Sequence, residues 1–322
     1  MIQNIAFTID EADERPGRLD KAILGRFPTS SRALVNAAFA EGGVLLDDRP
    51  AAKSDRPRRG GVVTLPRLLE RADRAPLPQA GELRILLADD AVLAIDKPGG
   101  QPCHPVEPGE TGTLANALAA RFPEMAGVGD DPAMPGLLHR IDSGTSGIVL
   151  CARTQAAFEA IRRQFTARTV DKTYLAVVHG EVAKAGGVSG WLAHCSSFRG
   201  RMRCVASASL PKGERALFAE TFYKPLRVDG GRTLLEVTIA TGVTHQIRCQ
   251  LASIGHPIVG DATYGPDRPL DGPFGPHHLL HAAALAFAHP ATGARTTIKS
   301  APPKDVAREN SGAPPVPLFP RA

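Results

Sequence analysis

Residues 137–152 constrain the fold more than any other stretch, because they join a polar glycine turn directly to a buried-strand pattern. The second part, residues 148–152, is short, apolar and partly β-branched, which predicts a buried strand. The turn before it carries two glycines and three hydroxyl side chains, and Asp142 stands at its start. A carboxylate on a turn beside a rigid strand can be held in place and still reach a ligand. The same pattern also fits an aspartate that only caps its own turn.

The length and composition predict an intracellular globular protein. The chain has 322 residues, enough for one large domain or two ordinary ones, and a net charge of +5 that suits a polyanionic partner. No apolar run approaches the roughly 20 residues needed to cross a bilayer, and the N-terminus lacks a signal-peptide pattern. The five cysteines are scattered and form no Cys-x-x-Cys pair, which predicts reduced thiols and a cytoplasmic location.

Residues 1–66 predict a small α/β unit. Strand patterns near residues 5–9, 44–46 and 62–65 surround two short helix patterns that begin near Arg18 and Arg32. An arginine-rich connection precedes the last of these strands. Helix starts and guanidinium groups suit phosphate binding, and the alternative is a solvated charged surface.

The remaining chain predicts a linker, a large domain and a tail. Residues 67–80 are expected to be a linker, because Pro76 and Pro78 favour extended backbone. Residues 306–322 are expected to be a flexible tail. Between them, residues 81–305 alternate strand and helix patterns. Strands are expected at residues 83–87, 92–95, 148–152, 170–180 and 234–240. Helices are expected at 155–165, with Thr154 as its cap, and in a stretch that begins within 241–248 and reaches residue 254.

Several motifs together resemble the RluA-type pseudouridine synthases. His-Arg-Ile-Asp-Ser-Gly-Thr-Ser-Gly begins at His139, Lys-x-Tyr-x-Ala begins at Lys172, and Thr-Gly-Val-Thr-His-Gln-Ile-Arg ends at Arg248. Residues 1–66 are similar to the alpha-L RNA-binding module that precedes many of these catalytic domains. The resemblance implies a mixed α+β fold: a central, mostly antiparallel sheet with flanking helices, plus a small α/β RNA-binding domain.

The resemblance also implies a reaction, the isomerisation of a specific uridine in structured RNA to pseudouridine. Asp142 would be the catalytic carboxylate, acting as nucleophile or as base. Arg248 would hold it ionised and oriented, and Tyr174 would stack beneath the everted base and assist late proton removal. Nothing is oxidised and no group is donated, so neither a cofactor nor a metal is expected. The RNA would be ribosomal, with tRNA as the alternative, and the protein a monomer.

Basic and polar side chains near these motifs are expected to contact the RNA. A loop with two arginines around a glycine, at residues 199–201, suits close approach to a phosphate backbone. The residues expected to bind RNA are Arg140, Thr145, Lys172, Arg199, Arg201, His245 and Gln246, together with Arg18, Lys21 and Arg32 in the N-terminal segment.

Two positions depart from the family pattern. Val243 replaces a basic residue that the family usually carries, which is expected to change the RNA that fits. Asp47 and Asp48 stand where the module usually carries Asn-Gly, which weakens the expected RNA affinity of residues 1–66. The histidines His277, His278 and His281 are not expected to bind a metal, because no acidic or cysteine partner has suitable spacing.

Competing functions are less consistent with the residues around Asp142. An aspartate phosphotransferase needs Asp-x-Asp, but Arg140 and Gly144 stand two residues before and after Asp142. Residues 144–147 do not form the Gly-x-Ser-x-Gly nucleophile elbow. The rival of another class is a catalytically silent RNA-binding or ribosome-assembly protein. The joint presence of Asp142, Tyr174 and Arg248 argues against it, because binding alone does not require this combination.

Overall fold

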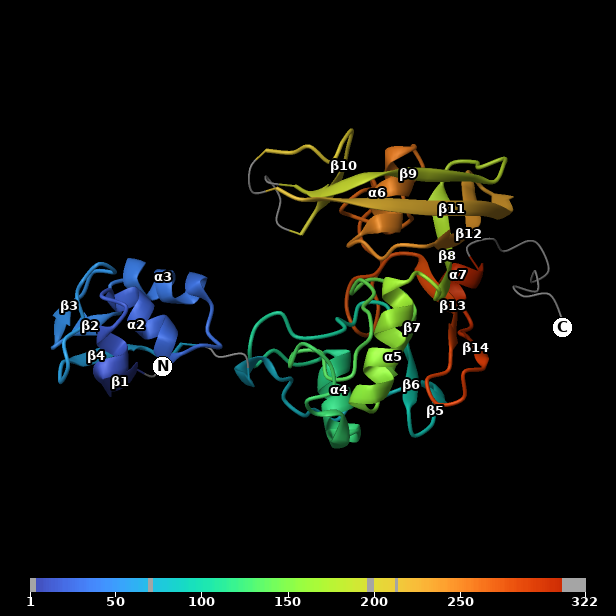
Figure 1. The fold of residues 1–322 in the computed structure, drawn as a ribbon. Coiled ribbons are helices and arrows are strands. Elements are labelled where there is room, and N and C mark those ends of the chain that lie inside the picture. Colours follow the sequence, from blue (N-terminus) through green and yellow to red (C-terminus); the bar gives the residue numbers. More distant parts are fainter. Residues whose placement is uncertain (1–3, 69–71, 196–199, 212–213, 309–322) are drawn as a thin grey trace. The chain divides into compact units, whose positions relative to one another are not determined.

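A computed structural model describes residues 4–68, 72–195, 200–211 and 214–308. The chain separates into two units (Figure 1). The first comprises residues 1–75 with 107–109, and the second comprises residues 76–106 with 110–322. No helix among the described residues is both long enough and apolar enough to cross a membrane.

The N-terminal unit packs short helices on a small antiparallel sheet with the strand order β1-β4-β2-β3. Leu19, Ile23, Val35 and Val63 are fully or almost fully buried where the apolar faces meet. The elements are β1 (Asn4–Thr8), α1 (Glu11–Glu14), α2 (Leu19–Arg26), α3 (Arg32–Ala40), β2 (Leu45–Leu46), β3 (Arg49–Pro50) and β4 (Val62–Pro66).

Asp47 and Asp48 form the tight turn between β2 and β3. Both have left-handed backbone conformations, with φ of 50° and 60°. A two-residue hairpin turn of this kind favours Asn-Gly, and aspartate is among the other residues that tolerate it. The Asp47 carboxylate also accepts a hydrogen bond from the backbone N–H of Val62 at 2.8 Å. The aspartates therefore keep the turn while adding negative charge to it.

The second unit is built on one sheet, which has ten strands in the described part of the chain. The main order is β10-β9-β11-β12-β8-β13-β7-β6-β5, and β14 pairs with β13. Only the β13–β7 pair is parallel among these described strands, so the expected mostly antiparallel sheet is confirmed. The strands are β5 (Ile85–Ala88), β6 (Val92–Lys97), β7 (Ser146–Ala152), β8 (Asp171–His179), β9 (Gly186–His194), β10 (Met202–Val205), β11 (Ala216–Asp229), β12 (Arg232–Ile239), β13 (Leu280–Ala288) and β14 (Arg295–Lys299).

Two helices lie against different strands of this sheet, as Figure 1 shows. Helix α5 (Gln155–Thr166) packs on β7 and β13, and helix α6 (Gln246–Ser253) packs on β9, β10 and β11. All seven residues of β7 are buried, which fits the apolar run at its residues 148–152. The remaining helices are α4 (Leu114–Arg121), α7 (Lys304–Arg308) and the short 3₁₀ turns η1 (Ala72–Arg74) and η2 (Pro123–Met125).

Most of the expected strands and helices are present, with shifts of a few residues at their ends. Thr154 caps α5 by accepting a hydrogen bond from the backbone N–H of Ala157, as predicted. Strands β9 and β11 were not predicted. Strand β9 contains Gly186, Gly187 and Gly190, which have low strand propensity, and pairing with β11 compensates for this. Residues 304–308 form a helix, so the chain is ordered beyond residue 305; the rest of the expected tail lies outside the described residues.

Candidate active site

Asp142 lies on the turn that leads into β7, and neighbouring segments fix this turn. The main-chain carbonyl of Asp142 accepts a hydrogen bond from the N–H of Thr145 at 3.0 Å. The Nζ of Lys97 donates to the carbonyl of Ser143 at 3.1 Å, and the Thr145 hydroxyl lies 2.9 Å from Nε2 of His278. Lys97 and His278 come from two distant parts of the sequence, so these contacts fix the position from which the Asp142 side chain projects.

The guanidinium of Arg248, on α6, joins two carboxylates. Its Nη1 donates to Asp142 at 2.9 Å, while Nε and Nη2 donate to the two oxygens of Asp261 at 2.7 and 2.8 Å. Nη2 also contacts the Thr263 hydroxyl at 3.1 Å. Burial alone would lower the pKa of Arg248, but the hydrogen bonds and charges of the two aspartates raise it above its usual value. Arg248 is therefore a permanent, oriented cation beside Asp142.

The Asp142 carboxylate hydrogen-bonds to Arg248 rather than to its own turn in the described structure. The turn is closed by the main-chain carbonyl of Asp142 instead. This geometry leaves part of the carboxylate free to meet a ligand. Of the two sequence-based readings of Asp142, ligand contact fits better than turn capping.

A hollow of about 140 Å³ opens beside the Asp142–Arg248 pair. Tyr174, from β8, forms part of its wall and is itself buried. Burial, and secondarily the charge of Asp142, raises the pKa of the Tyr174 phenol above its usual value. The phenol therefore stays neutral at physiological pH. The hollow thus combines an acceptor oxygen, a fixed cation and an aromatic ring.

His245 lines the same hollow at the start of α6. Its backbone is left-handed, with φ of 53°, and its Nδ1 lies 3.1 Å from the hydroxyl of Tyr264. Its Nε2 lies 3.9 Å from Asp142. Burial lowers the pKa of His245, so the ring is neutral at pH 7 and forms no ion pair with Asp142 there.

Thr145 and Gln246, both expected to bind RNA, are buried and bonded within the protein. Thr145 contacts His278, and the Gln246 amide accepts from Thr241 at 2.8 Å while donating to the carbonyl of Glu220 at 2.9 Å. These bonds fix the turn before β7 and the entry to α6. A positioning role therefore fits both side chains better than direct RNA contact.

The basic residues expected around the site fall into separate places. Arg140 is exposed and its Nη1 lies 3.0 Å from Nε2 of His104, while Lys172 donates to the carbonyl of Thr241 at 2.9 Å. The exposed Arg201 places its guanidinium 5.5 Å from the centre of the Tyr264 ring. Arg199 lies outside the described residues. Val243 lines the hollow where the family usually has a basic residue.

The three N-terminal residues expected to bind RNA belong to the other unit. Lys21 and Arg32 are exposed there, on α2 and α3. Arg18 forms an ion pair with Asp20, with Nε 3.0 Å from the carboxylate. Because an internal partner neutralises Arg18, Lys21 and Arg32 are the better candidates for phosphate contact.

Sequence reasoning missed the roles of Asp261 and Lys97. Asp261 is buried and forms the fork that orients Arg248; no local pattern distinguishes it from an ordinary turn aspartate. Lys97 is fully buried, and its Nζ donates to the carbonyls of Pro98, Gln101 and Ser143 at 2.7–3.1 Å. Burial lowers the pKa of Lys97 to about 8. The lysine ties the loop after β6 to the Asp142 turn.

The three neighbouring histidines have protein partners. His277 pairs with Asp305 at 2.9 Å, His278 contacts Thr145, and His281 contacts the Ser146 hydroxyl at 2.9 Å. Across the described residues, no group of three His, Cys, Asp or Glu side chains is arranged to hold a metal ion.

Comparisons with known proteins give a consistent picture. A family model described as RNA pseudouridylate synthase matches residues 91–253. The chain is 36% identical over 309 residues to a ribosomal large subunit pseudouridine synthase D of Xanthomonas campestris pv. campestris, covering 92% of this chain and 89% of the relative. It is 30% identical over 298 residues to the protein of that name from Neisseria meningitidis serogroup B, covering 90% and 77%.

A solved structure supports the same assignment at the level of the fold. The structure of human RNA pseudouridylate synthase domain containing 1 aligns with a TM-score of 0.54 and 25% identity. The alignment covers 69% of this chain and 86% of the human chain.

Proposed function

Because the chain belongs to the RNA pseudouridylate synthase family, we propose that it isomerises uridine in large-subunit ribosomal RNA, with Asp142 as the essential carboxylate. The observation that carries the role of Asp142 is its bond to Arg248 at the edge of a hollow that Tyr174 also lines. The names of the relatives support the choice of RNA.

The reaction leaves the overall composition of the uridine unchanged. The bond between N1 and the ribose C1′ breaks, the uracil turns, and a bond forms between C5 and C1′. The proton on C5 leaves, and N1 takes up a proton. Asp142 serves as a nucleophile toward the sugar or the base, or removes a sugar proton, and both roles use a carboxylate fixed by Arg248.

The neutral Tyr174 ring provides the apolar support that an everted uracil requires. Its phenol oxygen is also a candidate for the late proton step at C5, because it lines the same hollow as Asp142. The burial of Arg248 strengthens its electrostatic hold on Asp142 as charge develops during the reaction.

The N-terminal unit is proposed to add affinity rather than chemistry. The exposed cations Lys21 and Arg32 lie on its helices, and the proposed catalytic carboxylate, Asp142, does not belong to this unit. Residues 67–80 would connect it to the catalytic unit of residues 81–305. The protein is proposed to act as a monomer, and a ribosomal RNA substrate supports action in the cytoplasm.

The direct test is tritium release from ribosomal RNA labelled at carbon 5 of uridine. The full-length protein should release tritium in proportion to pseudouridine formed, since the C5 proton is lost only when C5 joins the ribose. Mapping pseudouridines in cells with and without the protein should then show which pseudouridine is missing when the protein is absent. RNA binding without tritium release would favour the rival, a silent RNA-binding protein.

A further inference from the structure

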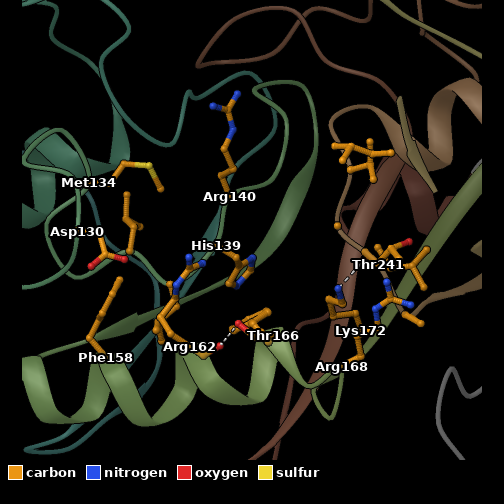
Figure 2. Close-up of a pocket in the computed structure, with 18 of the residues that line it drawn as sticks. Asp130, Met134, His139, Arg140, Phe158, Arg162, Thr166, Arg168, Lys172 and Thr241 are labelled. Carbon is orange, nitrogen blue, oxygen red and sulfur yellow. Dashed lines mark hydrogen bonds between the residues drawn. The ribbon is translucent and has the colours of Figure 1, made fainter. Parts of the chain in front are cut away.

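A second and larger hollow adjoins the Asp142 hollow. Its volume is about 680 Å³, within the range of about 300–1,000 Å³ that is typical of ligand sites. Arg140, Tyr174 and Val243 line both hollows, so Tyr174 stands between them. Figure 2 shows Phe158, Arg162 and Thr166 rising from helix α5 on one side and Lys172 bonded to Thr241 on the other.

Cations dominate the wall of this second hollow. Arg162, Arg168 and Lys172 have no carboxylate partner among the described residues. The Arg162 guanidinium lies 5.8 Å from the centre of the Phe158 ring, and the Lys172 ammonium lies 5.9 Å from that of Phe165. Asp130 and Asp131 also line the hollow, but together with Arg140 the cations outnumber them. Charges over rings suit a ligand with both a phosphate and an aromatic base.

Arg168 occupies a backbone position that normally favours glycine. It follows the end of α5 with φ of 58°, and the N–H groups of Arg168 and Thr169 bond back to the carbonyls of Phe165 and Gln164. This is a Schellman ending with arginine in the left-handed position, which costs about 1 kcal/mol relative to glycine. The strained position holds a charged side chain at the edge of the hollow.

His139 offers a fixed hydrogen-bond donor to the same space. Its Nε2 accepts a hydrogen bond from the backbone N–H of Leu150 at 3.0 Å, so the ring proton sits on Nδ1. Burial, and secondarily the charge of Lys172, lowers the pKa of His139 to about 3, so the ring stays neutral. The described residues provide no acceptor for Nδ1, and the ring packs against Phe165 with centres 5.3 Å apart.

We propose that the second hollow binds another nucleotide of the substrate RNA, close in the strand to the uridine at Asp142. Its phosphate would lie against Arg162 and Arg168, and an acceptor on its base would face Nδ1 of His139. The proposal rests on the proposed function, because continuity with the Asp142 hollow identifies the ligand as RNA. A nucleotide matches the cations, the rings and the neutral donor together, whereas an acidic peptide would use only the cations.

The test compares RNA binding by the full-length protein and a double variant, Arg162→Gln with Arg168→Gly. The probe is an unmodified transcript of large-subunit ribosomal RNA, titrated at several salt concentrations. Loss of one or two phosphate contacts should lower the slope of log K against log salt by about 0.7–1.4. Affinity at 0.1 M salt should fall about tenfold or more. Arg168→Gly relieves strain, so thermal unfolding should show that the variant still folds.

Arg163→Gln is the matched control. Arg163 lies on the same helix, is exposed and is not among the residues that line the hollow. Its substitution removes the same charge and should leave both the affinity and the salt slope unchanged. An unchanged slope in the double variant, or an equal loss in the control, would overturn the proposal.

A second arm examines the nucleotide itself. On a short RNA that contains the mapped uridine, an abasic residue at one neighbouring position should weaken binding by the normal protein. The double variant should be insensitive to the same change, because the two losses share one contact. If acidic peptides displace the RNA from the normal protein but not from the double variant, and no abasic position matters, the occupant is a peptide and the proposal fails.

The two proposals fail in different ways. If the double variant shows the expected smaller salt slope but the normal protein releases no tritium, the second nucleotide site stands and catalysis does not. If tritium is released while the slope is unchanged, catalysis stands and the second site does not. If the normal protein binds no RNA, both are wrong.

Discussion

Asp142 carries most of the proposed chemistry at the scale of single residues. We expect Asp142→Asn to abolish tritium release while leaving RNA affinity within a few-fold, because the amide keeps the shape but loses the charge that Arg248 holds. Single-turnover tritium release and filter binding measure the two effects. Asp90→Asn, an exposed carboxylate between β5 and β6, is the control and should change neither. Turnover above background in Asp142→Asn would remove Asp142 from its role.

Asp261 acts through Arg248. Burial would raise the pKa of Asp261, but the bonds from Arg248 outweigh it and lower the net pKa below its usual value. We expect Asp261→Asn to lower the single-turnover rate about 10- to 100-fold, because one bond of the fork is lost and the guanidinium can turn away from Asp142.

Thr263→Ala is a milder change to the same guanidinium. It removes only the 3.1 Å bond between the Thr263 hydroxyl and Arg248, so it should lower the rate less than Asp261→Asn does. Equal effects of the two substitutions on the rate would indicate general loss of structure.

Because the Asp261 pKa is lowered, its contribution to folding stability is present above about pH 4 and is lost as the pH falls through its folded pKa.

Lys172 predicts a pH dependence of RNA binding. Burial, and then the charge of Arg168, lowers its pKa to about 8, so the ammonium is lost between about pH 7 and 9. RNA affinity should weaken across that interval, and Lys172→Arg should remove the change because arginine stays charged. Arg168→Gly should move the midpoint upward, since a neighbouring cation disappears. A flat profile for the normal protein between pH 7 and 9 would contradict this role.

The same shift in the pKa of Lys172 affects folding stability. Because the folded pKa lies below the usual lysine value of 10.5, the folded state binds fewer protons than the unfolded state between about pH 8 and 10.5. The contribution of Lys172 to folding therefore becomes more favourable as the pH rises through that range.

Strand β7 sets the position of the Asp142 turn at the scale of elements, and Gly147 sets the position of β7. Its φ is 106°, and an added Cβ would lie 2.3 Å from the carbonyl oxygen of Ala282 on β13. We expect Gly147→Ala to lower the free energy of unfolding by about 2–6 kcal/mol, from backbone strain and overpacking together. Gly190→Ala on β9 has open space and no positive φ, so denaturant unfolding should show little change there.

The elements that could be predicted have strong local signals. The apolar run of β7 and the threonine cap of α5 depend on contacts within a few residues, and both were predicted correctly. Strand β9 could not be predicted, because its glycines give no strand signal and its partner β11 is distant in sequence. Helix α7 is short, and its buried Val306 packs in a cluster with Leu175 and Val259 that only the folded sheet assembles.

The two units have separate hydrophobic cores at the scale of the whole molecule. The N-terminal cluster draws on residues 9–68, and the main clusters of the second unit draw on residues 92–298. We therefore expect deletion of residues 1–75 to leave a folded, active remainder with weaker RNA binding and a smaller salt slope. Circular dichroism melts and salt titrations of the truncated protein measure this. An aggregated truncation would argue against two independent units.

The sequence by itself determined the family, the main strands and helices, and the identity of Asp142, Tyr174 and Arg248 as candidates, whose catalytic roles stay predictions. Only the tertiary structure decided how they are held. Arg248 meets Asp142, 106 positions earlier in the chain, and Asp261, 13 positions later, because a buried guanidinium needs acceptors for its donors and the fold supplies them from two separate turns. Local sequence patterns extend over only a few residues, so they carry no information about which distant charges become neighbours once the sheet has formed.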